Sequence, residues 1–294
     1  MNWNTRWIFA ASVALFVCSV TGLAVGGIPD ERGPEFLGTE RPRVGMHNDL
    51  PGVSFEKHYK RFGFDPEVFR AVMKGLELQE DDATVTNVSS EARVSELEEE
   101  HLDMVVASFS ITPQRGKRID FVGPYATTYQ GFLVGPEGAD IQEFGDLGGK
   151  VVCSWDGSTS ADVLRRFKLA DIEARTLLDA SACVQKLREG EVDAVFTDQM
   201  ILQGFADLYA ADGLRVVPGL TIGGPQHYGI GLPKGHRADC LRLREVLKDY
   251  VESSQWKRDF ETWLPGIAKQ DPAWISDYRP SADAIDARSC RDSP

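Results

Sequence analysis

The stretch SFSITPQR, at residues 108–115, follows an apolar run from Met104 to Ala107. The run predicts a buried strand, which delivers two hydroxyls and a guanidinium into the loop at its end. The planar donors of Arg115 suit a carboxylate, and the short side chains of Ser108 and Ser110 can complete a cradle for an anion. The alternative is a basic turn exposed to solvent, and the rest of the chain decides between the two.

Strand and helix patterns alternate on both sides of this stretch. The first series has strands predicted at 43–46, 84–88 and 104–107, and helices at 66–76 and 93–100. The second series has strands predicted at 150–153, 173–177, 194–197 and 214–217, and helices at 161–168, 180–188 and 199–209. Strands separated by helices indicate an α/β fold with parallel strands.

Two extended segments connect the two series. They lie at 126–134 and 223–232, and two amphipathic helices at 238–253 and 255–262 lead the chain back to the first series. This order predicts two lobes joined by two crossing strands, with a cleft between them. Ligands of such sheets bind beyond the carboxyl ends of the strands, and hinged lobes close around them. The predicted lobes are 41–127 with 228–279 for the first, and 128–227 for the second.

The two ends of the chain differ from its body. A weakly basic start, an apolar run over 8–25 and small residues after it predict an export signal in residues 1–26. An uncleaved anchor is the alternative, because the run is near the lower limit for crossing a bilayer. Residues 27–40 predict a linker, and residues 280–294 predict a disordered polar tail. We expect the body of the protein to be exported, either secreted or held at the cell surface.

Composition narrows the function classes. The chain has 294 residues, of which 42% are hydrophobic and 26% charged, as in ordinary globular proteins. Its formal net charge of −13 disfavours nucleic acid as a partner. The histidines and cysteines show no metal-ligand spacing, so we expect neither a metal site nor a cofactor.

Export changes how four of the cysteines are interpreted. In an oxidising compartment an even number of thiols suggests disulfides. Cys153 ends a predicted strand and Cys183 opens a predicted helix, and closing that loop would stabilise the fold by about 3–4 kcal/mol. Two buried free thiols are the alternative. A pairing of Cys240 with Cys290 then follows by elimination.

Further polar residues stand where strands lead into helices. The GSTS loop places the hydroxyls of Ser158 and Thr159 at a helix start, where free backbone N–H groups favour an anion. A plain helix cap is the alternative. Asp198 follows a predicted strand, so it either caps the next helix or meets a ligand ammonium. Ser90 and Arg93 form a candidate second polar cluster in the first series.

From about residue 41 to residue 265 the chain resembles the family 3 extracellular solute-binding proteins of bacteria, the polar amino-acid receptors of ABC importers. The motifs that carry the resemblance are GFD at 63–65, DMVVASFSITPQRGKRIDFVGPY at 103–125, GSTS at 157–160, EGEVDAVFTDQMIL at 189–202 and YGIGLPKG at 228–235. The resemblance implies a two-lobed periplasmic-binding-protein fold of type II. The Cys153 and Cys183 pair also resembles a disulfide of the glutamate-type branch.

The resemblance implies roles for the residues that hold the backbone of an amino acid. Arg115 and Ser110 would bind the α-carboxylate from the first lobe, and Thr159 would join from the second. Asp198 would bind the α-ammonium, with the backbone carbonyl of Ser108 assisting.

Other matched positions concern the ligand's side chain. Ser90 and Arg93 match positions that face the side chain in members specific for acidic amino acids, and His47 falls where such members often carry a basic residue. A second guanidinium is costly to bury unless an anion meets it, so glutamate or aspartate is the expected ligand. The alternative is that Arg93 caps its helix or pairs with Glu91 or Glu96 at the surface.

Two features depart from the family pattern, one of which is a polar tail after Pro265 that is longer than the family needs. The aromatic residue that packs on the ligand from the first lobe is hard to place, and Phe55, Tyr59 and Phe62 are all candidates.

These observations predict a monomeric binding protein and not an enzyme. It would capture a polar amino acid by lobe closure and deliver it to the membrane subunits of an ABC importer. The alternatives are the amino-acid-sensing part of a signalling system and a dehydratase on the same fold. A dehydratase needs a general acid aimed into the cleft, and the candidate carboxylate, Asp198, is already assigned to the ammonium.

Overall fold

The computed structural model describes residues 35–37, 41–166 and 172–291. The predicted export signal at 1–26 and most of the predicted linker lie outside these residues. Within the described ranges, no helix is both long and apolar enough to cross a membrane.

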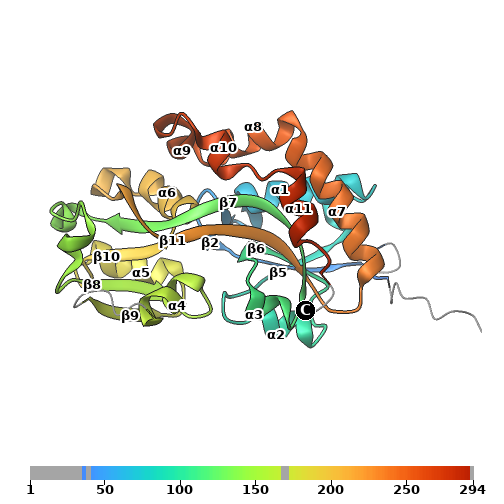
Figure 1. The fold of residues 1–294 in the computed structure, drawn as a ribbon, viewed down its shortest axis with the longest axis horizontal. Helices are drawn as coiled ribbons and strands as arrows, with labels where there is room; N and C mark the ends of the chain where they lie inside the picture. The colour runs from blue at the N-terminus through green and yellow to red at the C-terminus, as the bar shows by residue number, and fades with distance from the viewer. Residues whose placement is uncertain (1–34, 38–40, 167–171, 292–294) are drawn as a thin grey trace, which may run out of the picture. The chain divides into compact units, whose positions relative to one another are not determined.

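One eight-stranded sheet runs through both lobes (Figure 1). β1 pairs in parallel with β5 and β6, and β8 pairs in parallel with β10 and β9, as the alternating pattern predicts. We call the part built around β5, β1 and β6 the first lobe, and the part built around β10, β8 and β9 the second lobe. The strand order is β5 (Thr84–Asn87), β1 (Arg43–Met46), β6 (Met104–Ser110), β11 (Arg215–Leu232), β7 (Asp120–Val134), β10 (Ala194–Asp198), β8 (Val151–Trp155) and β9 (Glu173–Leu177).

The two central strands, β7 and β11, are antiparallel and long enough to belong to both lobes. Their pairing extends from Arg215 opposite Val134 to Leu232 opposite Asp120. The strand predicted at 214–217 is therefore not separate but the first part of β11. Pro218 and Gly219 follow the predicted strand, and they fall within a register shift of the pair, where the chain bulges without leaving the sheet.

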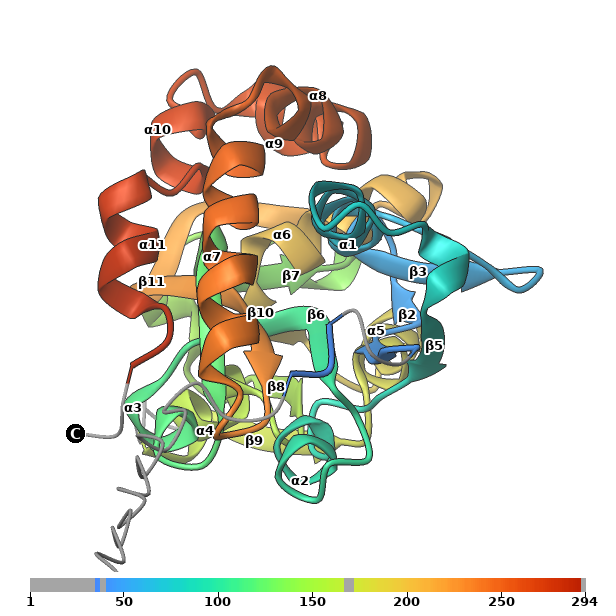
Figure 2. The same ribbon diagram turned by 90° about the vertical axis from the view of Figure 1, so that its right-hand side faces the viewer.

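Helices cover both faces of the sheet (Figures 1 and 2). In the first lobe, α1 packs against α7 and α8, while α2 and α3 lie on the opposite face. In the second lobe, α6 packs on β7 and β11, whereas α4 and α5 pack on β8 and β10. The bounds are α1 (Phe64–Gly75), α2 (Arg93–Glu98), α3 (Pro113–Gly116), α4 (Thr159–Arg166), α5 (Ala180–Arg188), α6 (Gln199–Leu208), α7 (Arg237–Glu252) and α8 (Ser254–Trp263).

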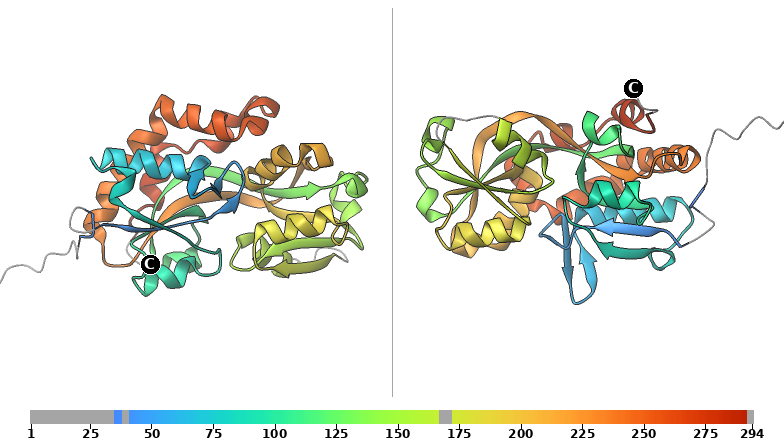
Figure 3. Two further views of the ribbon diagram at one scale, coloured as in Figure 1. Left: turned by 180° about the vertical axis from the view of Figure 1, so that it is seen from behind. Right: turned by 90° about the horizontal axis from the view of Figure 1, so that it is seen from below.

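Shorter elements complete the described chain. A small antiparallel sheet consists of β2 (Asp49–Leu50), β3 (Ser54–Lys57) and β4 (Lys60–Phe62). Single 3₁₀ turns occur at Glu80–Asp82, Pro136–Gly138, Phe144–Leu147 and Ala210–Asp212. Three helices follow α8: α9 (Pro265–Gln270), α10 (Trp274–Tyr278) and α11 (Ala282–Arg288). Figures 2 and 3 show the β3–β4 hairpin projecting from the first lobe.

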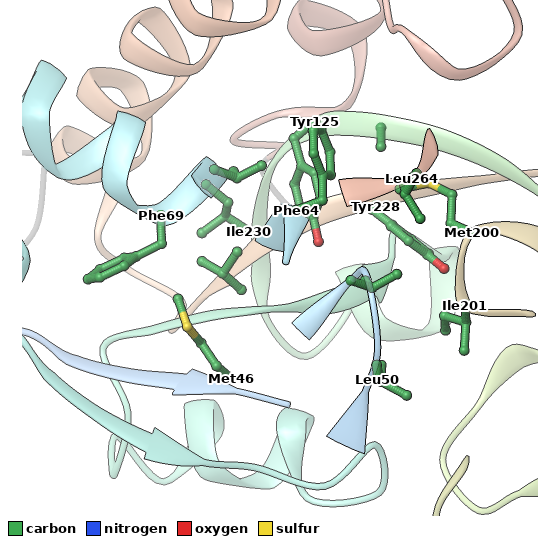
Figure 4. Close-up of a cluster of buried hydrophobic side chains, with 14 of the residues drawn as sticks. Met46, Leu50, Phe64, Phe69, Tyr125, Met200, Ile201, Tyr228, Ile230 and Leu264 are labelled. Carbon is green, nitrogen blue, oxygen red and sulfur yellow. The ribbon is translucent and has the colours of Figure 1, made fainter. Parts of the chain in front are cut away.

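An aromatic cluster ties α1 to the crossing strands (Figure 4). The Phe64 ring meets Trp256 and Phe260 edge to face, with centroids 5.6 and 5.5 Å away. On its other side it approaches Tyr125 of β7, whose ring lies 6.0 Å from that of Tyr228 in β11. Aromatic pairs of this geometry stabilise a fold by more than the burial of their apolar area alone accounts for. The cluster therefore fixes the first-lobe ends of both crossing strands against one helix.

The prediction of a disordered tail over 280–294 is wrong for the residues described there. The helix α11 forms there, and the side chain of Ile285 is buried. Just before this segment Trp274 and Tyr278 are buried as well, and the Trp274 ring stacks on Phe260 at 4.7 Å. The tail is polar on average, so its composition did not reveal the apolar side chain that reaches the core. The last part is fixed covalently, because Cys290 is bonded to Cys240.

Part of the predicted linker is also anchored. Phe36 and Leu37 are buried, and their backbone N–H groups donate to the carboxylate of Asp239 in α7. The other predicted disulfide is present as well, with Cys153 of β8 bonded to Cys183 of α5. Each disulfide joins segments of a single lobe.

Candidate ligand-binding site

Strand ends from both lobes meet around a polar cavity of about 20 Å³. This volume holds about one water molecule, so an amino acid can enter only when the lobes move apart. All of the predicted ligand-binding residues line the cavity except Arg115, which lies beside it. The lining residues are His47, Leu50, Ser90, Arg93, Ser108, Ser110, Trp155, Ser158, Thr159, Ser160, Thr197, Asp198 and Ile201.

Arg115 projects from the short helix α3 that follows β6. Its backbone N–H donates to the side chain of Thr112, which caps this helix. The guanidinium donates to the carbonyl of Ser110, 2.7 Å away, and across the cleft to the carbonyl of Gly157, 2.8 Å away. Burial lowers the pKa of Arg115 to about 10, so the group remains a cation at neutral pH.

Arg93 is the more deeply buried cation, with an exposed fraction of 3%. Its guanidinium donates to the carbonyls of Ser90, Ala107 and Ser108 at 3.2, 2.6 and 3.3 Å. Burial, and then the charge of Arg115, lower the pKa of Arg93 to about 9. The alternative of an exposed arginine at the helix surface is therefore wrong: Arg93 faces the cleft as a buried cation.

Both guanidiniums lie over one aromatic ring. The carbon at the centre of the Arg93 guanidinium is 4.5 Å from the centroid of Phe109, and that of Arg115 is 4.9 Å away. An aromatic face stabilises a nearby cation, more so when water is excluded. Sequence reasoning missed Phe109, although it lies between the two serines of the SFSITPQR stretch.

His47 and Ser90 form a series of polar contacts that ends at Trp155 of the second lobe. The ring nitrogen Nε2 of His47 is 3.4 Å from the hydroxyl of Ser90, which also accepts from the indole N–H of Trp155 at 3.2 Å. Burial, and then the charge of Arg93, lower the pKa of His47 well below its usual value. His47 is thus neutral at pH 7, and its expected role as a basic residue for the ligand's side chain is not supported.

The aromatic residue beside the cavity comes from the other lobe. Trp155 lines the cavity, whereas Tyr59 is 98% exposed at the tip of the β3–β4 hairpin and Phe62 packs on Trp263 at 6.2 Å. Phe55 lies in β3 outside the lining. The three first-lobe candidates are therefore wrong. Trp155 ends a strand directly before the GSTS loop, and that position was the available signal.

Ser108 has a left-handed backbone, with φ of 46°, which is unfavourable for a residue with a side chain. Its N–H and hydroxyl donate to Asp65 at 2.8 and 3.1 Å. Asp65 also accepts from the hydroxyl of Tyr125 at 2.7 Å. Burial raises the pKa of Asp65 to about 6. Asp65 therefore fixes the left-handed backbone at Ser108 near the end of β6, a role the GFD motif did not reveal.

The hydroxyls of the GSTS loop make different contacts. Ser158 accepts from the N–H of Ala161 at 3.0 Å and so caps the start of α4. Thr159 and Ser160 are instead held by the side-chain amide of Gln130 in β7, whose nitrogen lies 3.0 and 2.8 Å from their oxygens. Ser158 thus fits the capping alternative, while Thr159 remains at the cavity.

Asp198 lies at the end of β10, with an exposed fraction of 4%. Its Oδ2 accepts from the hydroxyl of Tyr228 at 2.6 Å. Within the described residues its Oδ1 is buried and has no hydrogen-bond partner, and its side chain makes no capping bond to the described helix α6. Burial raises the pKa of Asp198 to about 6. The capping alternative therefore fails, and one carboxylate oxygen is left for a donor.

The lobes touch closely at one glycine. Gly157 has φ of 71°, and a Cβ atom added to it would lie 2.4 Å from the backbone of Glu91 in the first lobe. Nowhere in the described ranges do His, Cys, Asp and Glu side chains group so as to hold a metal ion. The site is thus a closed, polar contact between lobes, with guanidiniums on one side and a carboxylate on the other.

The sequence and the fold both match known proteins. The family model described as bacterial extracellular solute-binding proteins, family 3, matches residues 43–266. The chain is 32% identical over 260 residues to the glutamate-binding protein GluB of Corynebacterium efficiens, covering 85% of this chain and 84% of that protein. It is 29% identical over 212 residues to the glutamine-binding protein GlnH of an ABC transporter of Bacillus subtilis, covering 72% and 74%.

Among solved structures, one of an ancestral arginine-binding protein bound to arginine superposes with a TM-score of 0.69. The two share 27% sequence identity, and the match covers 76% of this chain and 98% of that one.

Proposed function

Because the chain belongs to family 3 of the bacterial extracellular solute-binding proteins, we propose that it captures glutamate or aspartate outside the cytoplasm and delivers it to an ABC importer. In this proposal the lobes are 41–127 with 228–279, and 128–227, and the protein acts as a monomer without catalysis. The family and the relatives named above are binding proteins, which supports a role in capture.

The observation that carries the proposal is the opposition of charges in the closed cleft. On the first lobe Arg93 is a buried cation and Arg115 a partly buried one, and on the second lobe Asp198 is a buried carboxylate with one free oxygen. An α-amino acid is a zwitterion, so it can meet both. Its α-carboxylate would replace the Gly157 carbonyl as the partner of Arg115, and its ammonium would reach Asp198.

The second guanidinium supports an acidic side chain. Once Arg115 holds the α-carboxylate, Arg93 is left as a buried cation, and a buried cation needs an anion nearby. His47 is neutral, so it does not oppose an uncharged ligand, and Arg93 carries the preference for acid. Its Nε and Nη1 donors are bonded to carbonyls of the first lobe, and its Nη2 donates across the cleft to the Gly157 carbonyl at 3.5 Å. An acidic side chain of the ligand would replace this long contact.

A thermal-shift screen of the twenty L-amino acids on the purified protein tests the proposal. A ligand at a hundred times its Kd stabilises the fold by about 2.7 kcal/mol, which gives a clear rise in Tm. We expect glutamate or aspartate to give the largest rise, with calorimetry to rank their affinities. A larger rise with lysine or leucine would contradict the acidic preference, and no rise with any amino acid would contradict the function itself.

A further inference from the structure

The pairing of the two crossing strands is interrupted beside Tyr129. The register of β7 and β11 shifts at three places, and at the middle one the β11 residues 223–225 stand opposite Tyr129 alone. This bulge contains Gly223, whose φ is 79°, and bulges bend a strand. A hinge consists of a few residues that absorb a change in backbone angle. The middle bulge, between the first-lobe and second-lobe parts of the pair, is therefore a place where the lobes can turn.

The end of the described chain packs on this part of β7. The family match ends at residue 266, and we call the described residues after it, 267–291, the C-terminal brace. The ring of Tyr278 in α10 meets that of Tyr129 edge to face, with centroids 6.3 Å apart. Further along, α11 packs on β7, and the backbone N–H of Cys290 donates to the carbonyl of Phe121 at 2.8 Å. The brace thus contacts β7 both near its start and at the interrupted pairing.

The C-terminal brace is attached to the first lobe and also reaches the second. Its last helix is bonded to α7 through Cys240 and Cys290. The hydroxyl of Tyr278, a residue with an exposed fraction of 5%, lies 3.0 Å from the side-chain oxygen of Gln199 in α6. A tyrosine hydroxyl can donate or accept, so this contact holds whichever way the Gln199 amide is turned. It joins the lobes through two residues that do not line the ligand cavity.

The link lies on the opposite face of β7 from the start of α4. Successive residues of a strand project to opposite faces. Tyr129 projects towards Tyr278, whereas the next residue, Gln130, contacts Thr159 at the cavity. Figure 1 likewise shows α10 and α4 on different sides of β7. The crossing strand therefore separates the contact between Tyr278 and Gln199 from the place where a ligand binds.

A contact between lobes outside the cavity acts on every ligand alike. Resting on the proposed binding by lobe closure, we infer that the C-terminal brace stabilises the closed arrangement through Tyr278 and Gln199. Tyr278 is thus a positioning residue that raises affinity without touching the ligand. The apparent Kd of a protein equals its intrinsic Kd divided by the fraction that is competent to bind. Losing the contact lowers that fraction, and so raises the Kd of all ligands by one factor.

The first test removes only the hydroxyl, with Tyr278→Phe. By calorimetry we expect the Kd values of L-glutamate and L-glutamine to rise by the same factor, about two- to tenfold, the usual contribution of one hydrogen bond. Tyr250→Phe is the matched control, because the buried hydroxyl of Tyr250 bonds Asp259 within the first lobe at 2.9 Å. This control should lower the Tm but leave both affinities unchanged. Unchanged affinities in Tyr278→Phe, or a loss for one ligand only, would overturn the inference.

The second test measures the separation of the lobes without any ligand. Spin labels at Lys117→Cys in α3 and Arg166→Cys in α4, both exposed positions, report the distance across the cleft. Tyr278→Phe should shift the distances of the free protein to longer values, and Tyr250→Phe should not. An unchanged distribution in Tyr278→Phe would overturn the inference, even if the affinity fell. If wild-type protein binds no amino acid, the proposed function fails, but the label distances of the free protein still test the brace.

A double-mutant cycle tests whether Gln199 is the partner. Gln199→Met should raise the Kd by the same factor as Tyr278→Phe, and the double variant should lose no more than either single one, because all three lack the same contact. Losses that add in the double variant would show that the two residues act separately, which would overturn the inference.

Discussion

In the first lobe the charged groups of the site already have partners within the protein, whereas in the second lobe one carboxylate oxygen has none among the described residues. Arg93 and Arg115 donate to backbone carbonyls and lie over the ring of Phe109. Asp198 keeps its Oδ1 without a donor. The first lobe thus holds its cations in place without help, while the second lobe gains hydrogen bonds only when a donor arrives. This difference gives a zwitterion one orientation in the cleft.

Removing the charge of the second lobe should have the largest effect. We expect Asp198→Asn to weaken binding of any α-amino acid at least a hundredfold, because leaving a buried ligand charge unpaired costs about 2–5 kcal/mol. Arg115→Ala should cause a similar loss from the first lobe. Calorimetry measures both, and circular dichroism checks that the variants fold. Near-normal affinity in either variant would contradict the assignment of the zwitterion's two charges.

A selective effect is expected from the second cation of the first lobe. Arg93→Gln should weaken L-glutamate by about 1.5–3 kcal/mol, the usual contribution of a hydrogen bond to a charged group, while L-glutamine changes little. The ratio of the two affinities is the measurement, because a general loss of stability would affect both ligands alike. Arg118→Gln, which removes an exposed partner of Glu98, is the control. An unchanged ratio would show that Arg93 only supports the fold.

The contact between the lobes can be tested at Gly157. A methyl group there would lie 2.4 Å from the backbone of Glu91, so Gly157→Ala should hinder closure and weaken binding by about 1–3 kcal/mol, the usual cost of overpacking. Gly149→Ala is a matched control, since Gly149 has a similar φ of 73° and nothing within 4 Å of the added atom. Both variants should lose some stability from the backbone strain. Only Gly157→Ala should lose affinity for the amino acid. Equal affinities in the two variants would mean that lobe closure does not use this contact.

Lowering the pH should change the charge of the binding residues in the second lobe more than that of the arginines in the first lobe. Without ligand, burial raises the pKa of Asp198 to about 6, so lowering the pH protonates the carboxylate that the ammonium needs. Affinity should therefore be about tenfold weaker at pH 5 than at pH 7, while both arginines stay charged. The pKa of Asp65 is also about 6, so the pH profile of Asp198→Asn serves as the control and should be flat. A wild-type profile equally flat would refute the role of Asp198.

The sequence was most informative where strands end. Arg115, Asp198 and Thr159 could be found because each follows a strand, and the carboxyl ends of the strands in both lobes meet in one cleft. What could not be found depends on long-range packing. The neutral state of His47 results from burial beside Arg93, and the position of Gln130 opposite Asp198 depends on a strand pairing between distant segments.

Average composition and local turn residues were the least informative signals. The polar composition of residues 280–294 predicted a disordered tail, but α11 forms there and Ile285 reaches the core. The strand predicted at 214–217 stops before Pro218 and Gly219, because local turn residues do not reveal that a partner strand continues beside them.

The disulfide between Cys240 and Cys290 has a consequence for the order in which the protein matures. Cys290 is synthesised after every other described residue except Arg291, and the first lobe packs Trp274, Tyr278 and Ile285 into its core. The segment that forms the second lobe, including its own Cys153–Cys183 bond, is synthesised well before that. We therefore expect the lobe whose sequence begins second to be completed first, with the first lobe finished only when the last helix and its cysteine arrive.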